Sequence, residues 1–115
     1  MNFRGLAEQL EMEESELLEI IELFLETSAS DLGKIQSAVE EEDAQKAVHA
    51  AHSIKGAAAN LRLTAIFELA QRMEKEAREN RLDGAIGAVQ AIQENLDQID
   101  ESLKRETQRA EAAMA

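Results

Sequence analysis

The residues best suited to chemistry are a histidine, a lysine and a glycine within five positions of one another: His52, Lys55 and Gly56. On a helix, which turns by about 100° per residue, Lys55 and Gly56 lie one turn beyond His52 and neighbour it. A neutral imidazole can act as a nucleophile, a base or a metal ligand, and a lysine ammonium can offset the charge of an anion beside it. Glycine inside a helix costs about 1 kcal/mol relative to alanine. Its position here therefore predicts open space beside the histidine, with a helix-packing contact as the alternative.

A metal site is a second possibility, because His49 lies three residues before His52. The sequence forces no third ligand, and the helical wheel places His49 about 60° further from the core than His52. We therefore expect no metal at this position. Ser53 forms no nucleophilic dyad with His52, since adjacent helical positions point about 100° apart.

The elements that must position these residues are helices. The 115 residues include no proline, cysteine, tryptophan or tyrosine, and good helix formers dominate. Apolar residues recur at helical spacing, with Asp43 as the expected N-cap of the histidine-bearing helix and Asn80 as the expected stop of the next. The predicted elements are a short helix over about 3–10 and long helices over about 14–41, 44–61, 64–80 and 82–103, followed by a frayed tail over 104–115.

Short connections between four long amphipathic helices predict antiparallel neighbours. We expect one all-α domain over residues 1–115: an antiparallel up-down-up-down four-helix bundle, with its core over about 14–103 and a short extra N-terminal helix. Register arithmetic across the turns places His52 level with Ser28, Asp31 and Leu32 of the first long helix. The third long helix brings Glu74, Lys75 and Arg78 to the same level.

Charge narrows the choice of partners. The net charge of −12 argues against nucleic acid or an anionic membrane as the main partner. The segment from Lys46 to Arg81, however, contains seven basic and four acidic residues, so the histidine lies in a locally basic part of the sequence. The beginning of the chain has no apolar stretch typical of a signal peptide, and no run approaches the length of a membrane span. We expect a cytoplasmic monomer without a bound cofactor.

The stretch from Ala51 to Leu61, AHSIKGAAANL, resembles the motif of histidine-containing phosphotransfer (HPt) domains. That motif is a histidine, any residue, an aliphatic residue, lysine, glycine and then small residues. The resemblance covers roughly residues 14–103, including Phe24 and the third-helix pair Met73 and Glu74. One departure is Arg62, at a turn where the family often has glycine.

The resemblance implies a phosphocarrier of a two-component phosphorelay. His52 would accept a phosphoryl group from a receiver-domain aspartate and pass it to another receiver, with no ATP-binding or autokinase activity. Lys55 would stabilise charge and Gly56 would give steric access; Mg²⁺ is expected on the receiver. The implied partners are response-regulator receiver domains and a hybrid sensor histidine kinase.

We predict that the receiver docks across the first two long helices around His52, on an apolar centre with a basic rim. The predicted contacts are Leu25, Ser28, Leu32, Lys55, Ala59 and Arg62. Two alternatives remain: a non-catalytic helical adaptor that only binds receivers, and the phosphoacceptor module of a histidine kinase. The kinase module would require ATP-binding and dimerisation domains outside these residues.

Overall fold

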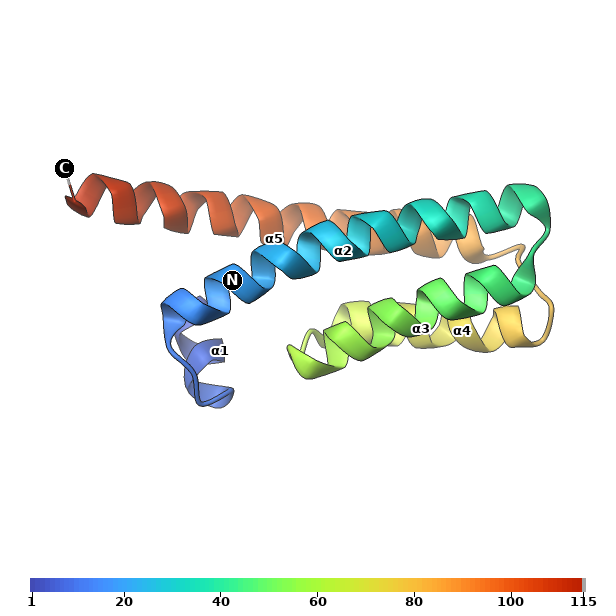
Figure 1. Cartoon of the computed structure of the whole chain (residues 1–115), viewed down its shortest axis with the longest axis horizontal. Helices are drawn as coiled ribbons and strands as arrows, with labels where there is room; N and C mark the ends of the chain where they lie inside the picture. The colour runs from blue at the N-terminus through green and yellow to red at the C-terminus, as the bar shows by residue number, and fades with distance from the viewer. Residues whose placement is uncertain (115) are drawn as a thin grey trace.

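The computed structural model describes residues 1–114, and all the regular secondary structure in this range is helical (Figure 1). The helices are α1 (Phe3–Gln9), α2 (Glu14–Glu41), α3 (Ala44–Asn60), α4 (Thr64–Arg78) and α5 (Ala85–Met114). None of the helices in this part of the chain is long and apolar enough to cross a membrane.

The long helices form the predicted antiparallel bundle. Helix α2 packs against α3 and α5, and α4 packs against α3 and α5. In Figure 1, α2 and α5 form a long pair that runs over the shorter pair α3 and α4. The short helix α1 folds back under the start of α2, where Phe3 and Ala7 enter the core. The bundle is elongated, at 52 × 25 × 16 Å.

The core consists of one apolar stripe from each long helix. The largest fully buried side chains include Leu17, Ile21, Ile35, Ile54, Ile66 and Ile92. Within α2 the buried residues recur every three or four positions, the spacing of one face of an α-helix: Leu17, Ile21, Phe24, Ser28, Leu32 and Ile35. The predicted helical stripes are therefore confirmed.

Each of the first four helices ends in the same way. A residue in the left-handed region follows the helix: Glu11, Glu42, Arg62 and Asn80, with φ between 54° and 61°. The amide of the next residue then donates to a carbonyl five residues back, as Leu63 does to Ala58 at 2.9 Å. This is the Schellman arrangement, which glycine usually completes. Arg62 thus adopts the left-handed backbone conformation that glycine adopts most easily.

The start of α3 follows the sequence prediction, because the Asp43 side chain accepts a hydrogen bond from the Lys46 amide at 3.1 Å. Two boundaries of the last helix differ. Helix α5 begins at Ala85, not 82–83, because residues 82–84 form the turn. It also continues to Met114, beyond the end predicted near 103. Beyond the apolar stripe the tail is rich in alanine, glutamate and arginine, whose high helical propensity favours continuation of the helix.

Candidate functional site

His52 lies on the solvent-facing side of α3, with its side chain 63% exposed. Gly56, one turn further on, is also exposed, and a Cβ added there would meet nothing within 4 Å. No neighbouring helix therefore requires a glycine at this position, which excludes the helix-packing alternative. The open space predicted beside the histidine is present.

Glu74 on α4 joins the two ionisable residues of α3. Its Oε2 lies 2.6 Å from His52 Nδ1, and its Oε1 accepts a hydrogen bond from Lys55 Nζ at 2.7 Å. Arg78 Nε is more distant, 3.9 Å from Oε1. The Glu74 side chain is only 8% exposed, so both carboxylate oxygens are satisfied by these neighbours within the protein.

The charge state of Glu74 determines which ring nitrogen of His52 carries the proton. Burial raises the pKa of Glu74, but hydrogen bonds from Lys55 and His52 and the charge of Lys55 lower it by more, so the pKa lies below the ordinary glutamate value. Glu74 is therefore ionised at neutral pH, and an ionised carboxylate can only accept hydrogen bonds. Nδ1 of His52 must carry the proton, and in the neutral ring the lone pair is then on Nε2.

The arrangement is a solvent-accessible imidazole whose tautomer is fixed by a buried carboxylate, beside an open space on its own helix. The model of the Hpt domain family matches residues 19–102 of this chain. The chain belongs to the Hpt domain family. Its class of function is therefore histidine phosphotransfer within a phosphorelay.

A solved structure supports the same assignment. The chain is similar to the crystal structure of histidine-containing phosphotransfer protein B (HptB) from Pseudomonas aeruginosa PAO1, with a TM-score of 0.80 and 27% sequence identity. The alignment covers 92% of each chain, so it includes nearly the whole bundle. No curated protein sequence matches the chain.

Within this Hpt domain the structure gives Lys55 a partner that the sequence analysis did not assign. The sequence suggested that its ammonium offsets the charge of a phosphoryl group transferred at the histidine. Instead the lysine side chain is 23% exposed and its Nζ bonds Glu74. Its direct contact in the protein is thus with the carboxylate that holds His52.

Glu74 is the functional residue that sequence reasoning missed. Register arithmetic placed it at the level of His52 but gave it no role. A signal was available, since Ala70, Met73, Glu74 and Ala77 share one buried face of α4. A glutamate within an apolar stripe is almost never buried without a partner, and the basic side chains of the facing helix supply one here.

Two residues of the predicted docking surface are not accessible. Ser28 and Leu32 are 1% and 2% exposed, so a partner cannot contact them, and that part of the prediction is wrong. The physical reason is that residues which face each other at one level of adjacent helices fill the core between them. Leu25 is half-buried and lies in a different groove, between α2 and α5, whereas Ala59 and Arg62 are exposed.

An exposed apolar groove near the end of α3 was also missed. It has a volume of about 470 Å³ and is lined by Leu10, Met12, Ile20, Leu23, Phe24, Thr27, Ala57, Asn60 and Leu61. Ile20 and Leu23 are 40% and 59% exposed. Leu23 falls outside the buried stripe of α2, and this off-stripe position was visible in the sequence.

His49 is exposed and lines a separate groove together with Asp31 and Lys34. Among residues 1–114 no three histidine, aspartate or glutamate side chains are grouped closely enough to hold a metal ion.

Proposed function

We propose that Nε2 of His52 is the phosphoacceptor of this Hpt domain, that it takes the phosphoryl group from an aspartyl-phosphate on a receiver domain and that it returns it to another receiver. The observation that carries the proposal is the Glu74 contact at 2.6 Å, because an ionised carboxylate accepts a hydrogen bond from Nδ1–H and so favours the tautomer with the lone pair on Nε2. The open space at Gly56 supports it, since an incoming receiver needs room beside the ring.

In the transfer step the lone pair of Nε2 forms a bond to phosphorus while the bond between phosphorus and the aspartate oxygen breaks. The aspartate leaves as a carboxylate, and no proton has to move. The phosphorylated ring retains its Nδ1 proton and becomes cationic, a charge that the Glu74 carboxylate stabilises. Because the step consumes no proton, the reverse step to a second receiver can use the same arrangement.

Lys55 has a supporting role in this proposal. Its ammonium neutralises part of the Glu74 charge and fixes the rotamer of the carboxylate through the 2.7 Å hydrogen bond. The chain supplies the nucleophile and its positioning groups, and Mg²⁺ belongs to the receiver. We further propose that this cytoplasmic carrier has no autokinase activity and acts as a monomer.

The apolar groove of Ile20 and Leu23 supports a revised docking surface. Ala57, which directly follows Gly56, lines this groove, so a receiver centred on His52 can extend over it. Exposed apolar side chains of this size are typical of the centre of a protein interface. We therefore place the receiver over the exposed face of α3 and this groove, with Ala59 and Arg62 at its edge.

The deciding experiment mixes the protein with a phosphorylated receiver domain. It should acquire one phosphoryl group that is labile in acid and stable in base, as phosphohistidine is, and ATP alone should add none. His52→Gln should abolish the label, whereas His49→Gln, the matched control one turn away, should retain it. Receiver binding without any label in the wild-type protein would favour the adaptor alternative.

A further inference from the structure

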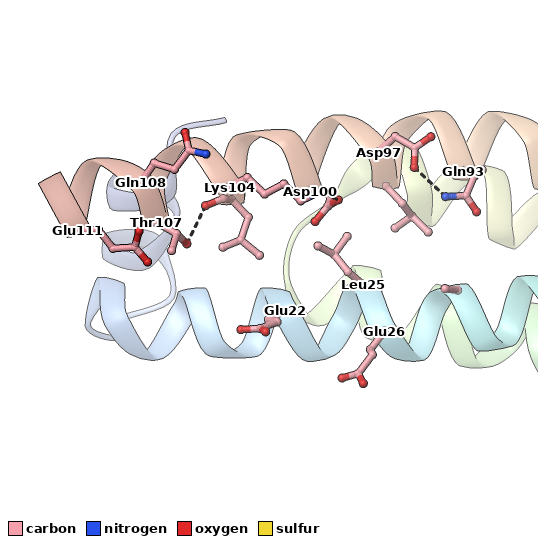
Figure 2. A pocket seen from close by; sticks show the side chains of 13 residues that line it. Glu22, Leu25, Glu26, Gln93, Asp97, Asp100, Lys104, Thr107, Gln108 and Glu111 are labelled. Atoms are coloured by element: carbon pink, nitrogen blue, oxygen red, sulfur yellow. Dashed lines mark hydrogen bonds and ion pairs between the residues drawn. The ribbon is translucent and has the colours of Figure 1, made fainter.

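A second groove lies between α2 and α5. It has a volume of about 720 Å³ and is lined by the residues that Figure 2 draws as sticks. Helix α3, which carries His52, packs against α2 and α4, whereas this groove is formed by α2 and α5. An occupant of the groove would therefore leave the histidine free.

The groove has an apolar floor. Leu25, Leu96 and Leu103 line it, together with the exposed Ala29. Figure 2 shows Leu25 of α2 directed toward α5, between the two helices. On α5 the lining extends from Gln93 to Glu111, about 27 Å at 1.5 Å per residue. The groove is thus long enough to accommodate a helix of about five turns.

The rims of the groove are acidic on both sides. Five carboxylates line it, Glu22, Glu26, Asp97, Asp100 and Glu111, against one lysine, Lys104. The lysine is already paired with Asp100 at 3.1 Å. The two helices are acidic as a whole: α2 has eight acidic residues and one basic residue, and α5 has six and three. A second copy of this chain would bring like charges together, which disfavours self-association here.

The tail of α5 adds an independent observation. Its residues after Leu103 are largely exposed and contribute little to the core, yet Thr107, Gln108 and Glu111 lengthen one wall of the groove. We propose that the α2–α5 groove binds a basic amphipathic α-helix of a partner protein, whose apolar face contacts the leucines and whose lysines or arginines pair with the rims. This interaction is additional to phosphotransfer and does not depend on it.

The probe is a synthetic peptide of about 18 residues, the length that matches the groove, with leucines at helical spacing flanked by lysines. It should bind the full chain and shift NMR signals of α2 and α5, while a scrambled peptide of the same composition should not. The affinity should fall as salt is added, because the rim charges are exposed. Shifts centred on α3, or equal binding of the scrambled peptide, would overturn the proposal.

Charge-reversal variants distinguish binding in the groove from general attraction by the net negative charge. Glu22→Lys combined with Glu26→Lys should weaken peptide binding about tenfold, since two attractions become repulsions. The matched control is Glu19→Lys with Glu94→Lys, on the same two helices but outside the groove lining, and it should leave the affinity nearly unchanged. Equal weakening in both pairs would show attraction by net charge alone and contradict the proposal.

Phosphorylation of His52 should proceed at the same rate in the wild-type protein and in both charge-reversal double variants. A failure of phosphotransfer would refute the proposed function but leave the peptide result standing. Sedimentation of the wild-type protein tests whether a second copy of the chain occupies the groove instead. If the protein self-associates and Glu22→Lys with Glu26→Lys alters that association, the groove binds a second copy and the proposed partner helix is wrong.

Discussion

The Glu74 carboxylate of α4 and the imidazole of His52 on α3 form a contact of 2.6 Å between Oε2 and Nδ1, across the boundary of two helices. The carboxylate is almost completely buried, whereas the ring is mostly exposed. Because an ionised carboxylate can only accept hydrogen bonds, this one contact both orients the ring and selects the tautomer with the proton on Nδ1. Glu74 is therefore a positioning residue for the proposed phosphoacceptor.

Glu74→Gln should slow phosphotransfer by about ten- to a hundredfold, the worth of a hydrogen bond to a charged group. The amide can donate as well as accept, so it no longer fixes the proton on Nδ1 and does not stabilise a cationic ring. Receiver binding should change little. The measurements are single-turnover transfer rates and the tautomer of His52 from ring-nitrogen NMR shifts.

The control for this variant is Glu68→Gln, an exposed position on the same helix. It should change neither the rate nor the tautomer. Thermal melts should accompany both, because Lys55 loses its charged partner in Glu74→Gln. If transfer slows while the histidine keeps its Nδ1-protonated tautomer, the effect is one of stability or packing and the positioning role is wrong.

Gly56→Leu should block transfer without destabilising the protein. The new side chain enters open space, so the helix should gain somewhat under 1 kcal/mol in stability. The transfer rate should fall by at least about a hundredfold, because a displacement of the reacting groups by about 1 Å has such an effect. Stopped-flow transfer and chemical denaturation would measure the two quantities.

Gly87→Leu is the matched control, since Gly87 is also exposed, helical and without neighbours within 4 Å. It lies on α5, which packs against α2 and α4. Transfer should be normal in this variant. A wild-type rate for Gly56→Leu would mean that the open space has no part in receiver approach.

Lys55→Ala should slow transfer about tenfold, through Glu74. Without the ammonium, burial acts on the carboxylate with less opposition, so the pKa of Glu74 should rise toward its ordinary value. The loss should persist at high salt, because Lys55 is largely shielded from solvent and its charge is poorly screened. Carbon NMR titration of the Glu74 carboxyl and transfer rates at two salt concentrations test this.

Arg78→Ala is the comparison, because Arg78 is 60% exposed and 3.9 Å from the same carboxylate. Its effect should be small and should disappear in salt. A salt-sensitive loss in Lys55→Ala would instead support a direct action of the ammonium on the transferring group.

The fold was predictable from the sequence because its signals are local. The apolar stripes of α2 and α3, the Asp43 cap and the Asn80 stop each depend on neighbours within a turn or two. The continuation of α5 to Met114 was missed because the end of the stripe of large apolar residues at Leu103 was given more weight than the high helical propensity of the tail.

The site was predictable only in part. The spacing of His52 and Gly56 can be recognised within the sequence of one helix, but the role of Glu74 depends on which side chain of α4 points toward α3. Register arithmetic fixes the level of a residue and not its direction. The same limitation placed the buried Ser28 and Leu32 on the docking surface and left out Leu23, which does face solvent.

Leu23→Gln tests the revised docking surface. Leu23 is 59% exposed, so the substitution should leave stability nearly unchanged, and it should weaken receiver binding about five- to tenfold by removing apolar area from the interface. Calorimetric titration with a receiver would give the affinity. The matched control is Ile86→Gln, a 41% exposed apolar residue on α5, which should bind normally. If the two substitutions weaken binding equally, or if receiver-induced NMR shifts bypass Ile20 and Ala57, the receiver docks elsewhere on the bundle.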